Sequence, residues 1–216
     1  MMHNALSALV IHDIKNALAL LEIELEQLNH HEGVPAEGQR AYRRCLELKG
    51  RLMGFLTLYK HDQSGLNPMV SEVDIAEFLE DLVDASQSVQ MGRSRQGHPV
   101  SVEVGPGGNA NVGFFDQNLV ELALESALNN AVRYAHREVR IWAERQGGVL
   151  TFKVCDDGIG VGRVDETVQR GEKSSSTGLG LALCEAVAKA HGSGSISLEN
   201  VAGGGTLFCM TLHKAG

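Results

Sequence analysis

The large apolar residues of the first sixty positions recur in steps of three and four, and this period restricts the N-terminal part of the chain to helix. A polar stretch that contains Gly33 and Pro35 interrupts the period and predicts a loop. The sequence therefore predicts an amphipathic helical hairpin. Its two apolar series are Ile11, Ile14, Leu18, Leu21, Leu25 and Leu28, and Ala41, Cys45, Leu48, Leu52, Phe55 and Tyr59.

Further apolar residues beside these series widen the stripe beyond what one hairpin can cover. They are Leu20, Ile23, Leu46 and Leu56. We therefore expect two hairpins to pair as a dimeric four-helix bundle.

A polar, turn-rich segment between Lys60 and Met69 marks the expected boundary between two domains. The predicted division is a helical hairpin over residues 1–62, a linker or hinge over 63–70, and a second domain over 71–216.

The second part of the chain has the pattern of a mixed sheet. The order of its elements predicts an α+β domain in which helices cover one face of the sheet. The expected helices span 71–90 with Asp74 as cap, 117–135 with Asp116 as cap, and 178–190, and the expected strands span 99–104, a short stretch that ends at Asp116, 139–145, 149–155, 194–199 and 206–212.

The composition excludes several classes of protein. The net charge is -8, from 27 acidic and 19 basic residues, and no basic cluster with interleaved aromatic residues occurs, so nucleic acid and anionic membrane surfaces are not expected partners. No apolar run reaches the roughly 18 residues of a membrane span, so we expect a cytoplasmic protein without a membrane segment. The four cysteines, Cys45, Cys155, Cys184 and Cys209, are widely spaced in apolar surroundings, which predicts buried thiols in a reducing compartment.

The first candidate for chemistry is His12, in the stretch IHDIKN. With Ile11 and Ile14 on the apolar stripe, His12 projects about 100° away from it, and Asn16 follows one turn later on the same side. A neutral imidazole can act as a nucleophile, Asp13 can take its proton, and Asn16 can orient water or a phosphoryl oxygen. An ordinary surface histidine remains the alternative interpretation.

Two further candidates follow in the second domain. Asn130, in LNNAVRYA, offers an amide oxygen that can bind Mg²⁺. Asp156, in CDDGIG, can accept a hydrogen bond from an adenine amino group, while Gly158 and Gly160 allow the backbone to approach a flat ring. Taken singly, these patterns are also typical of a helix surface and of a turn after a strand.

Gly178 and Gly180, in SSSTGLGLAL, open the third expected helix, where backbone N–H groups can meet phosphate oxygens. The alternative is a flexible loop and an ordinary helix cap. The glycine-rich stretch AGGGTLF at 202–208 predicts a tight hairpin rather than a direct ligand site.

In their order and spacing these motifs resemble those of the sensor histidine kinases. The resemblance runs from about Ala5 to Leu212. The first part is similar to the dimerisation and histidine-phosphotransfer hairpin, and the second to the ATP-binding domain that is shared with the gyrase, Hsp90 and MutL ATPases. The resemblance thus implies an α/β-sandwich ATP-binding domain after the dimeric four-helix bundle.

The resemblance also implies roles for individual residues. His12 would receive the γ-phosphoryl group of ATP, Asp13 would accept the proton, and Asn16 would position water during dephosphorylation of the partner. Asn130 would hold Mg²⁺. The residues implied to contact ATP are Asn130, Asp156, Gly158, Gly160, Lys173, Thr177, Gly178 and Gly180.

The implied partners are a second copy of the chain, bound through the hairpin, and the receiver domain of a response regulator. Eleven residues precede His12. We therefore expect the signal to come from a separate sensor protein or from an input domain outside this sequence.

The sequence departs from the family pattern at several positions. Ser126 stands where a second asparagine is common, which weakens one polar contact or moves it to Glu125 or Asn129. Ser176 replaces a glycine, no phenylalanine occurs in 161–177, and no proline follows His12. These differences bear on the rate of autophosphorylation more than on ATP binding.

Three alternatives stay open beside the kinase. One is a histidine phosphotransfer relay dimer whose degenerate ATP domain no longer catalyses, which would need His12 but not Asn130 or Asp156. The others are a serine kinase that acts on an anti-sigma antagonist and a helical scaffold with an inactive nucleotide domain.

Overall fold

The structure is a computed structural model that divides into two compact units, residues 1–53 and 54–216. Each unit is described by itself. The residues that the structure describes are 14, 16–27, 36–90, 100–106, 108–161 and 178–213.

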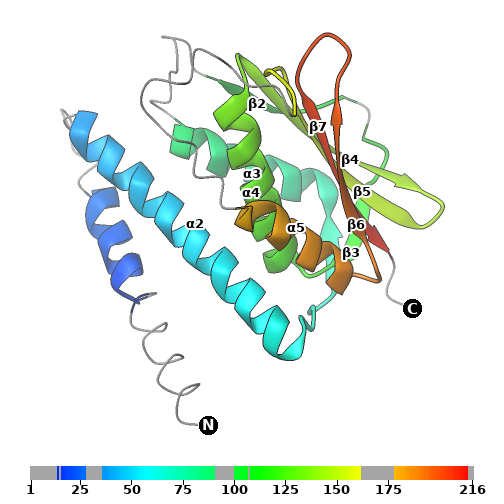
Figure 1. The fold of residues 1–216 in the computed structure, drawn as a ribbon, viewed down its shortest axis with the longest axis horizontal. Helices are drawn as coiled ribbons and strands as arrows, with labels where there is room; N and C mark the ends of the chain where they lie inside the picture. The colour runs from blue at the N-terminus through cyan, green and yellow to red at the C-terminus, as the bar shows by residue number, and fades with distance from the viewer. Residues whose placement is uncertain are drawn as a thin grey trace. The chain divides into compact units, whose positions relative to one another are not determined.

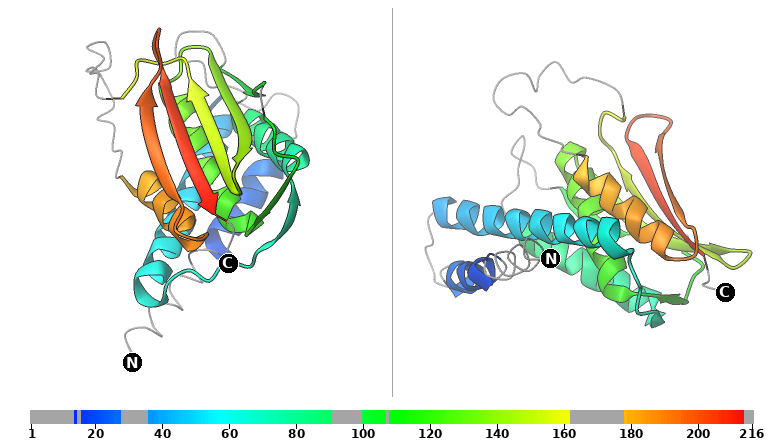
Figure 2. Two further views of the ribbon diagram at one scale, coloured as in Figure 1. Left: turned by 90° about the vertical axis from the view of Figure 1, so that its right-hand side faces the viewer. Right: turned by 60° about the horizontal axis from the view of Figure 1, so that its bottom comes forward.

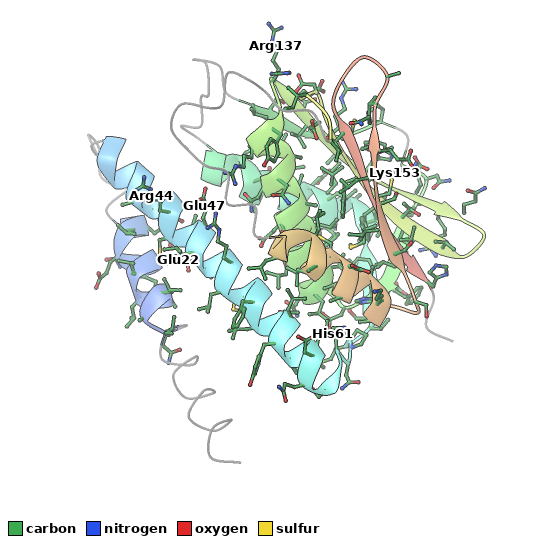
Figure 3. All side chains as sticks on the ribbon, in the orientation of Figure 1. Glu22, Arg44, Glu47, His61, Arg137 and Lys153 are labelled. Carbon is green, nitrogen blue, oxygen red and sulfur yellow. The ribbon has the colours of Figure 1, made fainter. Side chains whose placement is uncertain are left out.

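In the first unit, residues 16–27 are helical, and helix α2 begins at Ala36 and continues to Ser64 in the second unit. The two helices contact each other: the Cys45 thiol donates to the carbonyl oxygen of Leu18 at 3.8 Å. Lys49 Nζ lies 2.6 Å from Glu22 Oε2, and Figure 3 shows Glu22 on the helix that faces α2. The predicted loop and His12 lie outside the described residues.

Much of the predicted apolar stripe is exposed in the first unit. Leu20 is 63% exposed and Leu48 is 54% exposed, although Cys45 is buried. The dimeric bundle that would cover these side chains stays a prediction.

Helix α2 ends at the boundary that the sequence indicated between Lys60 and Met69. It continues through Ser64, so the first two residues of the predicted linker are helical. Gly65 then adopts a positive φ of 74°, and its N–H donates to the carbonyl oxygen of His61 at 2.8 Å. This is the left-handed conformation that commonly terminates a helix.

The second unit contains a five-stranded mixed sheet with helices on one face (Figure 2, left). Strand β2 is parallel to β4, and the other neighbouring strands are antiparallel. The predicted mixed sheet is therefore confirmed. In spatial order the strands are β2 (Ser101–Val104), β4 (Glu138–Gln146), β5 (Val149–Asp156), β7 (Thr206–His213) and β6 (Ser195–Asn200), and the helices are α3 (Ile75–Gln90), α4 (Gln117–Tyr134) and α5 (Leu179–Ala190).

The core lies between the sheet and these helices (Figure 1). Phe115 and Phe152 are fully buried, and with Phe78 they form three edge-to-face pairs whose ring centroids are 5.3, 5.5 and 5.9 Å apart. Such pairs add to the stabilisation from burial. They anchor α3 to the middle of the sheet.

The prediction of one helix over 71–90 is wrong at its start. Residues 71–74 form strand β1 (Ser71–Asp74), which pairs antiparallel with β3 (Val112–Phe115). A four-residue stretch is too short for its own pattern to reveal a pairing with residues 40 positions away. The predicted cap at Asp74 is confirmed, because its Oδ1 accepts from the N–H groups of Ala76 and Glu77 at 2.9 and 3.1 Å.

The prediction of four buried thiols is correct for two of them. All four cysteines are free, and Cys45 and Cys184 are buried, whereas Cys155 and Cys209 are only partly buried. The latter two lie in β5 and β7 at positions whose side chains point away from the helices, since side chains alternate along a strand.

None of the helices in the described part of the chain combines the length and the apolar character needed to cross a bilayer.

A buried network of hydrogen bonds joins the start of α4 to the end of α5. Asp116 caps α4 as predicted, because its Oδ1 accepts from Leu119 N–H at 3.1 Å, and its Oδ2 accepts from Met69 N–H at 2.8 Å. The N–H of Asp116 donates to His191 Nε2 at 3.0 Å. The other ring nitrogen of His191 lies 2.8 Å from the carbonyl oxygen of Val187. This network indicates the neutral tautomer with its proton on Nδ1.

Replacing His191 with phenylalanine is expected to destabilise the second unit by about 2 kcal/mol, because the buried N–H of Asp116 loses its acceptor. Urea unfolding measures the difference. His213→Gln, at an exposed histidine, serves as control. If His191→Phe and the unaltered protein had the same free energy of unfolding, this hydrogen-bond network would not be important for stability.

Candidate functional site

The candidate site lies where α4, the start of α5 and the end of β5 meet. Helices α4 and α5 lie side by side on the same face of the sheet (Figures 1 and 2). The predicted residues Asn130, Asp156 and Gly180 come from these three elements.

Asn130 and Gly180 face each other across α4 and α5. A Cβ atom added at Gly180 would lie 3.3 Å from Asn130 Nδ2 and 2.6 Å from Ser126 Oγ. The glycine therefore keeps free the space in front of these two polar side chains. Ser126, which replaces the second asparagine of the family pattern, faces Gly180, whereas Asn129 is exposed.

Helix α5 begins at this place with open backbone donors. Gly178 is its N-cap residue, with φ of 68°, and in the described structure no side chain caps the helix start. The first N–H groups of a helix carry partial positive charge and favour anions. The open helix start is compatible with the predicted phosphate contacts of Gly178 and Gly180, which stay a prediction.

Asp156 is a buried carboxylate at the end of β5. It is 7% exposed, and its Oδ1 accepts from Gly158 N–H at 2.8 Å. Thr206 hydrogen-bonds the same carboxylate through its N–H and its hydroxyl group. Burial raises the pKa of Asp156, although these hydrogen bonds oppose the shift.

Thr206 is a site residue that sequence reasoning missed. The stretch AGGGTLF by itself predicts a hairpin, and its glycines do connect β6 to β7. The available signal was a threonine that directly follows three glycines and opens a strand.

The structure gives a second reason for the glycines of CDDGIG, beside the predicted approach of the backbone to a flat ring. A Cβ atom at Gly158 would lie 2.2 Å from the carbonyl oxygen of Tyr134, so α4 and the turn after β5 can approach closely only with glycine here. Gly160 has φ of 85°, and a Cβ atom there would lie 2.4 Å from Asn200 Oδ1.

Asn200 holds the backbone that follows Gly160. Its Oδ1 accepts from Val161 N–H at 2.6 Å, and its Nδ2 donates to the Val161 carbonyl oxygen at 3.3 Å. Val161 is the last described residue before residue 178. Asn200 thus fixes the backbone at the edge of the candidate site. Like Thr206, it is a residue that the sequence pattern does not single out.

The remaining predicted site residues lie outside the described residues or in the first unit. His12, Asp13, Lys173 and Thr177 lie outside the described residues, and their roles stay predictions. Asn16 is an exposed residue of the first helix.

Residues 115–216 match the family described as histidine kinase-, DNA gyrase B- and HSP90-like ATPase. The sensor histidine kinase CpxA of Escherichia coli strain K12 is 28% identical over 197 residues, which cover 84% of this chain and 41% of CpxA. The alginate biosynthesis sensor protein KinB of Pseudomonas aeruginosa is 26% identical over 217 residues, covering 93% of this chain and 35% of KinB. The chain thus spans less than half the length of these relatives. The chain is thus similar to sensor proteins and sensor histidine kinases over most of its length.

The fold of the chain is shared with solved structures of histidine kinases. The histidine kinase AdeS of Acinetobacter baumannii matches with a TM-score of 0.61 and 18% identity, over 95% of this chain and 98% of that chain. The cytoplasmic segment of histidine kinase QseC matches with a TM-score of 0.53 and 18% identity, over 80% of this chain and 94% of that chain.

Proposed function

We propose that the chain is an ATP-dependent protein-histidine kinase of a two-component system. The observation that carries the proposal is that Asn130 faces Gly180 at the uncapped start of α5, while the buried carboxylate of Asp156 lies at the end of β5, where Gly158 approaches the end of α4. A nucleotide needs a hydrogen-bond acceptor such as Asp156 at its adenine end. At its phosphate end it needs backbone N–H donors, such as those at the start of α5, and a metal ligand such as Asn130. The family that residues 115–216 match consists, by its description, of ATPases.

In this proposal Asp156 accepts a hydrogen bond from the adenine amino group, with Gly158 and Gly160 at the edge of the ring. The N–H groups that follow Gly178 bind phosphate oxygens, and Gly180 leaves room for them. Lys173 and Thr177 complete the phosphate contacts.

Asn130 would hold Mg²⁺ through its amide oxygen. Magnesium at nucleotide sites keeps several waters and takes few protein ligands, because the phosphates supply the rest. This fits the described residues, among which no group of three or more His, Cys, Asp or Glu side chains converges on one point. When bound, the ion neutralises phosphate charge during transfer.

The acceptor is His12. An imidazole nitrogen of His12 forms a bond to the γ-phosphorus, the bond from that phosphorus to the bridging oxygen breaks, and ADP leaves. Asp13 takes the imidazole proton. Such a transfer depends mainly on positioning and on stabilisation of charge, so a few well-placed groups suffice.

The phosphoryl group then passes from His12 to an aspartate of a response regulator, and Asn16 positions water when the regulator is dephosphorylated. We propose a homodimer through the helical hairpin, in line with the exposed Leu20 and Leu48. We also propose a cytoplasmic location, supported by the likeness to the cytoplasmic segment of QseC, and input from a separate sensor protein or from a domain outside this sequence.

The test is incubation of the purified protein with Mg²⁺ and γ-labelled ATP. We expect a label that is labile in acid and stable in base, and its loss in both His12→Gln and Asn130→Ala. Glu80→Gln, at an exposed position of α3, should label like the unaltered protein.

A different outcome would assign another function. If the protein stays unlabelled by ATP but accepts a phosphoryl group at His12 from a phosphorylated receiver domain, the kinase proposal is wrong and the relay replaces it.

A further inference from the structure

We propose that Asp157 is a positioning residue that holds the end of α4 against the end of β5 and so sets the distance between the two halves of the nucleotide site. The inference rests on the proposed function, because it concerns the relative placement of Asn130 and Asp156. The sequence pattern alone indicates no role for Asp157, the second aspartate of CDDGIG.

The Asp157 carboxylate binds the backbone of the turn that joins α4 to β4. Its Oδ1 accepts from the N–H groups of His136, Arg137 and Glu138 at 2.8, 3.0 and 3.2 Å. Its Oδ2 lies 3.0 Å from the same N–H of Arg137. One side chain thus binds three consecutive amides.

The contact is reciprocal. The N–H of Asp157 donates to the carbonyl oxygen of Glu138 at 3.3 Å, while the N–H of Glu138 donates to Asp157 Oδ1. Figure 3 shows the Arg137 side chain extending away from the sheet and helices, so its backbone is what Asp157 engages. Apart from this backbone hydrogen bond, the Asp157 side chain supplies the contacts with the three amides of the turn.

The turn lies directly between the two halves of the site. Asn130 is in the last turns of α4, and the first of the bound amides, that of His136, follows two residues after the end of this helix. On the other side of the contact, Asp156 immediately precedes Asp157. On the same connection Gly158 packs against the carbonyl oxygen of Tyr134. Loss of the Asp157 contacts would allow α4 to shift relative to Asp156.

The ionised form of Asp157 is the form that makes these contacts. The backbone hydrogen bonds from Arg137, Glu138 and His136 lower its pKa, against the effect of burial, which acts in the opposite direction. Asparagine keeps an amide oxygen that can take the place of Oδ1, but it places an NH₂ group toward the N–H of Arg137. Alanine removes every contact.

The experiment is calorimetric titration of the full chain with ATP and Mg²⁺, for the unaltered protein, Asp157→Asn and Asp157→Ala. Glu80→Gln removes the same charge at an exposed position of α3 and is the matched control. We expect Asp157→Ala to raise the Kd about tenfold with unchanged stoichiometry, because small displacements of binding groups are costly. Asp157→Asn should fall between Asp157→Ala and the unaltered protein, and Glu80→Gln should match the latter.

Calorimetry measures the Kd and the stoichiometry separately, and so distinguishes a role of Asp157 in positioning the site from a role in stabilising the fold. A purely structural role would lower the fraction of binding-competent molecules and leave the Kd of the rest unchanged, which would overturn the inference. Unchanged binding in Asp157→Ala would also overturn it. No binding by the unaltered protein would instead overturn the proposed function.

Discussion

Asp156→Asn is expected to raise the Kd for ATP at least about 100-fold while leaving the free protein as stable as before or more stable. Asparagine can use its amide oxygen for Gly158 and Thr206, but in the proposed complex its NH₂ group would then face the adenine amino group. Two donors opposed in a buried site cost much of the binding energy. Calorimetric titration with ATP measures the loss.

The stability of the same variant should depend on pH, because folding raises the pKa of Asp156. A raised pKa stabilises the folded state below the ordinary value for aspartate, and this contribution is lost as pH rises through the folded value. Near pH 8 the unaltered protein buries a charge that Asp156→Asn lacks, so the variant should melt at the same temperature or higher.

Thermal melting of the free proteins at pH 8 and pH 5 checks the sign. Any advantage of the variant should shrink at pH 5, and Asp81→Asn, at an exposed position, should show no such trend. A variant that binds ATP normally, or that melts far lower at pH 8, would contradict the role assigned to Asp156.

Gly205→Ala is expected to destabilise the second unit by more than about 3 kcal/mol. Gly205 has φ of 95°, a conformation that costs other residues about 1–2 kcal/mol. In addition, a Cβ atom there would lie 1.9 Å from the carbonyl oxygen of Asp156 and 3.2 Å from Asp157 Cα. Both neighbours are backbone atoms, one in the last residue of β5 and one in the turn after it, and they cannot move without disturbing the site.

Gly203→Ala separates the two causes. Gly203 has a similar φ of 97°, but a Cβ atom there would meet nothing within 4 Å. Its substitution should therefore cost only the conformational part, about 1–2 kcal/mol. Urea unfolding compares the two variants, and equal losses would show that the contact with Asp156 is unimportant.

Local sequence patterns were sufficient to predict several helix caps and turns of the second unit. Asp116 and Asp74 cap helices as predicted, because an N-cap depends on residues within one turn. Gly147 and Gly148 form the predicted turn between β4 and β5, since both have positive φ. The predicted nucleotide contacts of Asn130, Asp156 and Gly180 rest on residue types within predicted elements or directly after them, and these contacts stay predictions.

The sequence by itself determined the helical period of the N-terminal part, most of the order of helices and strands after it, and the residue types on which the proposed nucleotide site rests. Only the tertiary structure decided that Ser71–Asp74 is a strand, because its partner lies some 40 residues away. It also decided that Thr206 joins Asp156 and that Asp157 holds the turn after α4. These contacts join segments that are distant in the chain, and no local period or spacing encodes which of them will meet.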